Sequence, residues 1–200
     1  MRGGTPKDRQ EKMIEALARV SPGTELREAV DRVLQVGSGA LIVAGDEGEL
    51  RPLMSGGFAI NTPFSAPRMY ELAKMDGAVI ISGDLQTIVS ANVHLVPNAA
   101  IPTHEAGTRH RTAERVARQT SALVIAISEK MHTVTIYVGD DHFTLENIRT
   151  VLAKADQALQ TLGRYRARFD KELRHLNTLE VEDTVTLGEV VRVVQTGEML

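Results

Sequence analysis

Two short stretches hold the residue types that can do chemistry in this chain of 200 residues. Asp76-Gly77-Ala78 sets a carboxylate beside glycine, where it can bind a divalent cation or accept a proton from a hydroxyl. Thr108-Arg109-His110-Arg111-Thr112 places two guanidiniums and an imidazole between two hydroxyls. Because guanidinium forks match phosphate oxygens, the two stretches together indicate a site for a metal-bound polyphosphate.

Each stretch also has a simpler structural interpretation. Asp76-Gly77 fits an ordinary helix C-terminus, with Gly77 as the left-handed cap residue. The arginine-rich segment fits the solvated start of a helix that we expect over 113–119, with Thr112 as its cap. Ser128-Glu129 ends an apolar strand and can bring a hydroxyl and a carboxylate to phosphate and metal, although a plain turn is the favoured interpretation when this pair stands alone.

The elements that must position these residues follow from hydrophobic periodicity. Amphipathic helices are expected over about 8–19 and 25–36, and another over 67–74 after the cap residue Ser65. Runs rich in Val and Ile, bounded by Gly, Pro, Asn and Asp, predict strands over 40–44, 78–82, 88–93, 122–128, 133–138 and 142–144. Several runs are apolar at consecutive positions, which is typical of strands buried on both faces. The predicted fold class is therefore α/β, with a mixed central β-sheet flanked by helices.

A long helical segment follows the sheet. From position 146 apolar residues alternate three- and four-residue spacings, a heptad-like seam that continues to 177. A helix of that length would measure roughly 48 Å, too long for a compact domain to bury, so we expect it to pack on a partner or form a stalk. Thr186-Leu187-Gly188-Glu189 matches a capping box that opens a final helix. The expected division is a domain over 1–145 and a helical linker over 146–200.

Composition excludes several classes of protein. The net charge of −3 disfavours a protein that coats DNA, and the absence of cysteine excludes disulfides and thiolate chemistry. The apolar runs are too short to cross a bilayer and no signal peptide is visible, so a cytoplasmic protein is expected. Gly37-Ser38-Gly39 lacks the third glycine and the following helix of a dinucleotide fingerprint, and no P-loop motif is present.

The order of the motifs resembles the diadenylate cyclase (DAC) domain family. A helix, the tripeptide DGA, a strand, the segment GTRHRT and a strand ending in Ser-Glu follow one another as in that family. Ser55-Gly56-Gly57-Phe58, 70–75 and 91–97 match the family as well. Within it the chain looks like the DisA branch, in which soluble helices precede the domain and a long helical linker follows.

The resemblance implies a reaction. Each domain would bind one ATP with a divalent cation, Mg²⁺ or Mn²⁺, and two domains would meet face to face. The 3′-hydroxyl of each ATP would attack the α-phosphate of the other, giving cyclic di-3′,5′-adenylate and two pyrophosphates. The active species would then be a homo-oligomer, at least a dimer, and the assembly of the branch is an octamer of two facing tetramers.

The resemblance also assigns roles to residues. Asp76 would hold the metal or draw the proton from the 3′-hydroxyl, and it would form the catalytic group together with Arg109, His110 and Arg111. Gly77 and Ala78 would line the ribose, and Leu95 would lie near the adenine. The remaining ATP-binding residues would grip the phosphates and complete the metal side: Thr108, Arg109, His110, Arg111, Thr112, Ser128 and Glu129.

Two other functions remain open at this stage. One is a non-catalytic nucleotide-binding oligomerisation module, which would share the phosphate-binding residues. The other is a nucleic-acid binder that uses the basic stretch Arg164–Arg174, although the net acidity and the 4% aromatic content count against it. Relatives in the branch carry a C-terminal helix-hairpin-helix domain that binds branched DNA, so DNA binding is expected only for a longer chain.

Overall fold

The computed structural model describes residues 6–145 and 148–198. The chain divides into two compact units, Met1–Glu146 and Asn147–Leu200, and each is described by itself.

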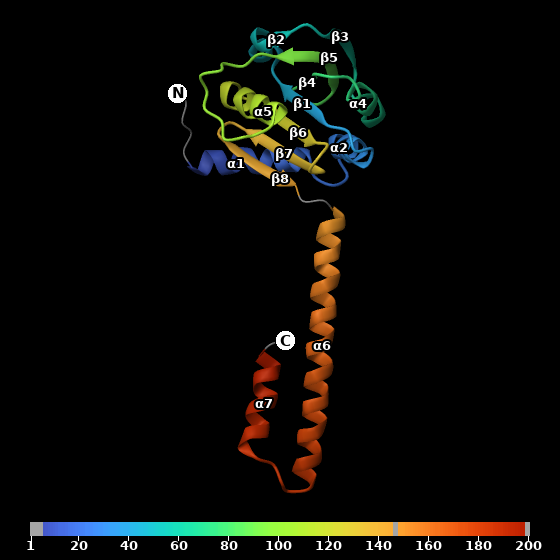
Figure 1. Ribbon diagram of the computed structural model, residues 1–200, viewed down its shortest axis with the longest axis vertical. Coiled ribbons are helices and arrows are strands. Elements are labelled where there is room, and N and C mark those ends of the chain that lie inside the picture. The colour runs from blue at the N-terminus through green and yellow to red at the C-terminus, as the bar shows by residue number, and fades with distance from the viewer. Residues whose placement is uncertain (1–5, 146–147, 199–200) are drawn as a thin grey trace. The chain divides into compact units, whose positions relative to one another are not determined.

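The first unit is built on a mixed, eight-stranded sheet (Figure 1). Neighbouring strands follow the order β2-β5-β4-β1-β6-β7-β8, and β3 also pairs with β5. β1 and β4 pair in parallel, and all other pairings among the described strands are antiparallel. The strands are β1 (Ala40–Gly45), β2 (Met54–Ser55), β3 (Phe58–Pro63), β4 (Ala78–Ser82), β5 (Thr87–Leu95), β6 (Leu123–Ser128), β7 (Thr133–Val138) and β8 (Asp141–Leu145). The predicted α/β class is confirmed.

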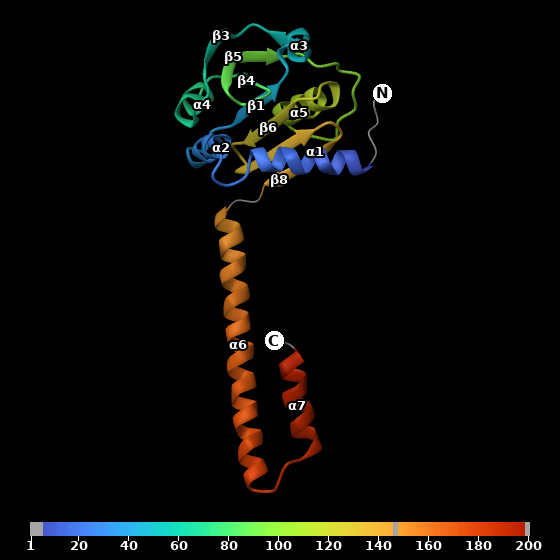
Figure 2. The same cartoon turned by 180° about the vertical axis from the view of Figure 1, so that it is seen from behind.

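Helices cover both faces of this sheet. Because side chains alternate along a strand, Ile42 of β1 points into one core and Val43 into the other. The first core contains residues of α1 (Pro6–Arg19), α2 (Glu25–Gln35) and α4 (Ala66–Leu72), and Figure 2 shows α1 across β7 and β8. The second core contains residues of α3 (Glu47–Leu50), the 3-10 turn η1 (Arg51–Leu53) and α5 (Thr108–Gln119). The central strands are therefore buried on both sides, as their continuous apolar runs indicate.

The start of α5 corrects one prediction. The helix expected over 113–119 with Thr112 as its cap begins at Thr108, and Gly107 is its N-cap residue. Gly107 contributes no side-chain capping bond, so the polar side chain that normally marks a helix start is missing there. The arginine-rich segment is consequently the first turn of the helix and does not precede it. This places its backbone amides, as well as its side chains, at the helix N-terminus.

The second unit consists of two helices that pack on each other, α6 (Ile148–Val181) and α7 (Leu187–Glu198). α6 has 34 residues and ends four positions later than predicted. The glutamate half of the capping box is present at the start of α7, since the backbone N–H of Thr186 donates to Oε2 of Glu189 at 3.0 Å. The N–H of Glu189 donates to the carbonyl oxygen of Thr186 at 3.1 Å. The hydroxyl of Thr196 joins the helices by donating to Oε2 of Glu172 at 2.6 Å. Within the described ranges, no helix combines the length and apolarity needed to cross a bilayer.

Candidate active site

Three strand ends meet at one edge of the sheet, and two of them adjoin predicted site residues. Leu41 of β1 pairs with Ala78 at the start of β4, and Ala40 pairs with Ile127 near the end of β6. The residues just outside these pairs, Asp76-Gly77 and Ser128-Glu129, therefore lie at the same edge, on strands that flank β1. Adjacent strands are about 4.8 Å apart, so a ligand the size of a nucleotide can reach both.

The first turn of α5 reaches the same edge through Arg109. Nη1 of Arg109 donates to the carbonyl oxygen of Ile127 at 3.5 Å. A Cβ atom built on Gly39 would lie only 2.1 Å from the same Nη1, so the guanidinium rests against the backbone that leads into β1. Gly39 therefore makes room for Arg109. Sequence reasoning missed this role; the only signal was a glycine directly before a strand.

Glycine is required at position 77 for two reasons, the backbone conformation there and the close approach of β5. Its φ of +90° is the left-handed conformation that glycine adopts at little cost. A Cβ on Gly77 would lie 2.9 Å from the backbone carbon of Asn92 and from the oxygen of Val93, both on β5. The close approach permitted by Gly77 is thus to a neighbouring strand. Asp76, immediately before it, is exposed in the turn between α4 and β4.

The first turn of α5 presents cationic side chains and unpaired amides together. Thr108 and Arg111 are exposed, whereas Arg109, His110 and Thr112 are half-buried. The N–H of Arg111 is the first to bond within the helix, at 2.9 Å from the oxygen of Gly107. The earlier amides of a helix have no intrahelical acceptor, which makes this turn suited to an anion.

His110 has a perturbed pKa. Burial lowers it from the ordinary value, the carboxylate of Glu105 opposes this by raising it, and the Arg109 guanidinium lowers it. The ring of His110 lies edge-on to that of Tyr137, with 6.4 Å between centroids. An imidazole in this environment is held with less positive charge near neutral pH than an exposed one, and a bound polyphosphate would restore that charge.

The remaining predicted residues differ in accessibility. The Ser128 hydroxyl is half-buried and accepts from the N–H of Met131 at 3.3 Å, and Glu129 is exposed in the turn after β6. Ala78 and Leu95 are buried in the second core. Ala78 could therefore meet a ribose only through its backbone, and the side chain of Leu95 is packed among apolar neighbours.

The carboxylate of Asp76 suits a metal that is shared with a nucleotide. Among the described residues, no group of three or more His, Cys, Asp or Glu side chains is arranged to hold a metal ion. Mg²⁺ commonly binds one or two carboxylates together with substrate phosphates and waters, and does not need a cage made by the protein alone. An exposed carboxylate at the edge that Arg109 also reaches fits that pattern.

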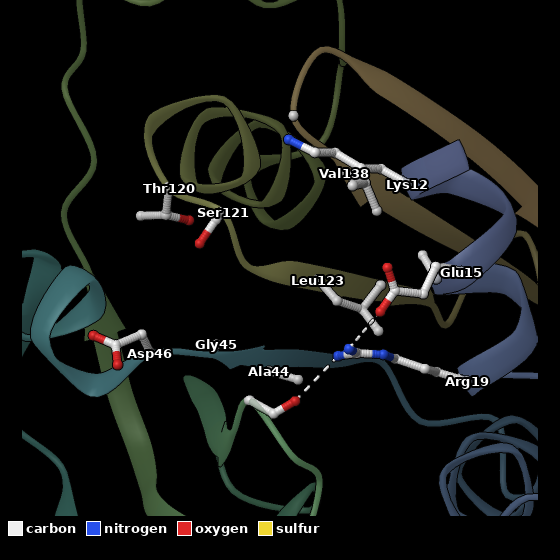
Figure 3. Close-up of a pocket in the computed structure, with 13 residues that line it drawn as sticks. Lys12, Glu15, Arg19, Ala44, Gly45, Asp46, Thr120, Ser121, Leu123 and Val138 are labelled. Carbon is white, nitrogen blue, oxygen red and sulfur yellow. Dashed lines mark hydrogen bonds and ion pairs between the residues drawn. The ribbon is translucent and has the colours of Figure 1, made fainter. Parts of the chain in front are cut away.

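A separate cavity lies at the opposite edge of the sheet. It measures about 300 Å³ and lies where β1 ends and β6 begins (Figure 3). Lys12, Glu15 and Arg19 of α1 line one side, and Asp46 and Ser121 line the other. None of the predicted site residues lines it. The cavity is therefore separate from the edge that holds Asp76 and Arg109.

Two family models match this chain. The family model described as "DisA bacterial checkpoint controller nucleotide-binding" (DAC) matches residues 27–142. The chain belongs to the DAC family. A second model, for the DisA linker region, matches residues 145–200.

Several relatives of this DAC chain share one name, DNA integrity scanning protein DisA. It is 50% identical over 194 residues to the DNA integrity scanning protein DisA of Clostridium acetobutylicum, which covers 97% of this chain and 54% of the relative. It is 49% identical to the protein of that name from Carboxydothermus hydrogenoformans, covering 96% of this chain and 54% of the relative. The chain thus spans about half the length of the curated relatives it matches.

Two solved structures share the DAC fold. A hypothetical membrane spanning protein from Bacillus cereus matches with a TM-score of 0.54 and 26% identity, covering 62% of each chain. A double mutant of DacA from Staphylococcus aureus matches with a TM-score of 0.50 and 22% identity, covering 70% of this chain and 90% of the other. This second likeness concerns the fold alone.

Proposed function

We propose that this chain is a diadenylate cyclase, which condenses two ATP molecules into cyclic di-3′,5′-adenylate and two pyrophosphates. Family membership supports the class of reaction. The observation that carries the proposal is the strand register, because it brings Asp76, Arg109 and Ser128 to one edge of the sheet from distant parts of the sequence.

The first turn of α5 would bind the triphosphate. Its free amides and the guanidiniums of Arg109 and Arg111 supply positive charge, and His110 adds a donor beside them. Thr108 and Thr112 offer hydroxyls to the same oxygens, and Ser128 and Glu129 complete the phosphate and metal side. Attack at a phosphorus that carries pyrophosphate depends mainly on in-line positioning and charge neutralisation, which this set provides.

Asp76 would act on the 3′-hydroxyl or on the metal. Its carboxylate would draw the proton from that hydroxyl or hold the divalent cation; Mg²⁺ or Mn²⁺ would neutralise phosphate charge when bound. The backbone of Gly77 and Ala78 would meet the ribose, and Leu95 would lie near the adenine. In each half-reaction, an O3′–P bond forms as the bond from the α-phosphorus to the pyrophosphate oxygen breaks.

Two copies of the chain are needed for this reaction. Each chain would bind one ATP at this edge of its sheet, and a second copy must bring the other ATP to the first. The active species would therefore be a homodimer or a larger assembly such as the octamer. DNA binding is a further proposal, which rests on the names of the relatives alone.

The decisive experiment is incubation of the chain with ATP and Mg²⁺ or Mn²⁺, followed by chromatography of the nucleotides. We expect one cyclic dinucleotide for every two pyrophosphates. Asp76→Asn should reduce the rate by at least about 100-fold because it removes the general base or metal ligand, while the melting temperature stays near that of the unaltered chain.

Glu71→Gln serves as the matched control for Asp76→Asn. Glu71 is an exposed acid on α4, paired with Lys74 at 2.8 Å and outside the predicted site. Its loss should leave the rate unchanged. If the unaltered chain at high concentration binds ATP but yields no cyclic product, the non-catalytic nucleotide-binding module replaces the cyclase.

A further inference from the structure

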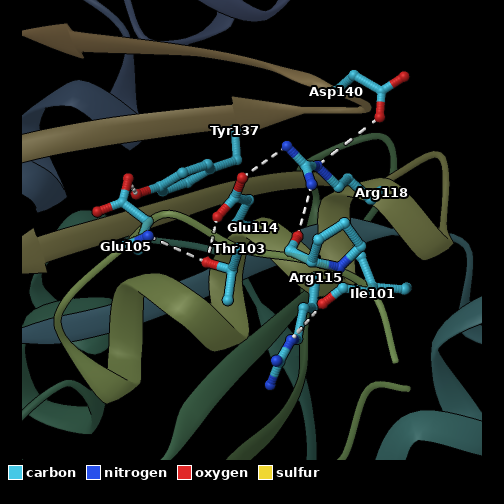
Figure 4. A network of polar contacts seen from close by, with 9 residues as sticks. Ile101, Thr103, Glu105, Glu114, Arg115, Arg118, Tyr137 and Asp140 are labelled. Atoms are coloured by element: carbon cyan, nitrogen blue, oxygen red, sulfur yellow. Dashed lines mark hydrogen bonds and ion pairs between the residues drawn. The ribbon is translucent and has the colours of Figure 1, made fainter. Parts of the chain in front are cut away.

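A polar network fixes the segment before α5 along the length of that helix. This segment, residues 96–107, is called the strap here. The N–H of Asn98 donates to Oε1 of Gln119 at 2.9 Å, near the end of the helix. Nε of Arg115 donates to the oxygen of Ile101 at 2.9 Å, in the middle. The strap therefore runs back along α5 towards its first turn (Figure 4).

A buried charge holds the middle of the strap. Glu114 is 8% exposed, and its carboxylate lies 2.7 Å from Nη2 of Arg118. It also accepts the hydroxyl of Thr103, and Nη1 of Arg118 donates to the oxygen of Pro102 at 2.6 Å. Because the buried carboxylate is paired and hydrogen-bonded, strap and helix are linked by interactions that are costly to break singly.

The end of the strap is tied to the sheet. The hydroxyl of Tyr137 on β7 donates to Oε1 of Glu105 at 2.8 Å, and the N–H of Glu105 donates to Oγ1 of Thr103 at 3.1 Å. Tyr137 is only 1% exposed. Burial and the neighbouring carboxylate raise its pKa well above the ordinary range, so the hydroxyl stays a donor at physiological pH.

A carboxylate at this place opposes the binding of an anion next to it. Glu105 precedes the N-cap Gly107 by two residues, and its negative charge acts on His110. Gly107 makes no side-chain capping bond, so the N-cap residue itself supplies no side-chain anchor for the helix start. The carboxylate of Glu105 supplies that anchor through Tyr137, which explains an acid beside a cationic turn.

We propose that Glu105 and Tyr137 form a positioning pair, which holds the first turn of α5 so that Arg109 and His110 meet the triphosphate. That the ligand is a triphosphate rests on the proposed function, whereas the hydrogen bond between Glu105 and Tyr137 does not. The titratable or charged groups around His110 are Arg109 and Glu114 of its own helix, Glu105 of the strap, Tyr137 of β7 and, behind Tyr137, His142 of β8.

The test measures binding of α,β-methylene-ATP with Mg²⁺ to the full chain, together with the NMR titration of His110 without nucleotide. Tyr137→Phe and Glu105→Ala should each weaken binding about tenfold, the factor expected when one hydrogen bond to a charged group is lost. Glu105→Gln keeps an acceptor for the tyrosine and should bind within about twofold of the unaltered chain. Its loss of charge should lower the pKa of His110 further.

Thr120→Val is the matched control. The hydroxyl of Thr120 donates to the oxygen of Val116 at 2.8 Å and accepts from Ala122, at the opposite end of α5. Thr120→Val should lower thermal stability without changing nucleotide affinity or the resonance of His110. A role of the pair in stability alone would instead give Tyr137→Phe and Thr120→Val the same behaviour.

The pair is refuted if Tyr137→Phe binds the analogue like the unaltered chain and the His110 resonance does not move. If the unaltered chain fails to bind the analogue, the proposed function fails. The resonance of His110 in the Tyr137→Phe variant, which keeps the charge of Glu105, then decides the positioning pair without reference to the nucleotide: a shift supports it, and an unchanged signal refutes it.

Discussion

Gly77 shows how one residue can satisfy two separate constraints. Its φ is +90°, and a Cβ there would come within 2.9 Å of the backbone of β5. Gly23 has nearly the same φ, +95°, yet nothing lies within 4 Å of its Cβ position. The two positions therefore separate the cost of a left-handed backbone from the cost of crowding.

Gly77→Ala should destabilise the chain more than Gly23→Ala. Gly23→Ala carries only the backbone cost of about 1 kcal/mol, whereas Gly77→Ala adds displacement of β5 for a total of about 3 kcal/mol or more. Chemical denaturation of both variants measures the difference. Equal losses would show that β5 moves aside at no cost, and that the contact with Asn92 does not constrain Gly77.

At the scale of elements, the start of β1 and the first turn of α5 depend on one contact. A Cβ on Gly39 would lie 2.1 Å from Nη1 of Arg109 and 2.9 Å from its guanidinium carbon. Gly39 is not among the residues with positive φ, so alanine is compatible with its backbone. Since the crowded atoms belong to the end of a flexible side chain, alanine displaces Arg109 more readily than it disturbs the sheet.

Gly39→Ala should therefore weaken ATP binding about tenfold with a change in stability of less than about 1 kcal/mol. The double-mutant cycle with Arg109→Ala tests the route of the effect. Once Arg109 is shortened, adding Gly39→Ala should change the affinity no further. Full additivity in calorimetric titrations would place the effect of Gly39 outside its contact with Arg109.

At the scale of the whole molecule, the proposed reaction depends on association, because each chain binds only one of the two ATP molecules. The rate of cyclic product per chain should rise with protein concentration and level off where sedimentation shows the chain fully associated. Nucleotide binding should vary much less over the same range, since a single edge holds one triphosphate. A rate per chain that stays constant into the monomeric range would contradict a reaction between two copies.

The second unit leaves apolar side chains uncovered within its own helix pair. Leu152 is 57% exposed, Leu159 65% and Val194 55%. Neither helix buries these side chains against the other. This agrees with the sequence-based expectation that α6 is too long for a compact domain to bury. This surface agrees with the expectation that the long helix packs on a partner, which remains a prediction.

The sequence by itself determined the class of fold and the chemistry to look for. Continuous apolar runs such as 122–128 indicate strands buried on both faces, because burial depends on local pattern. The capping box at Thr186 and the turn between β7 and β8 were likewise readable, since their bonds join close neighbours. The two-residue strand β2 and the true start of α5 were missed, as each lacks a strong local signal.

Only the tertiary structure decided which residues work together. Gly39 and Arg109, Gly77 and Asn92, and Glu105 and Tyr137 are far apart along the chain; the last pair is separated by 32 residues. Their contacts depend on strand order and register, which the apolar pattern of a single strand does not specify. The motifs predict the reacting groups, and the order and register of the strands place Asp76 and Ser128 at one edge of the sheet.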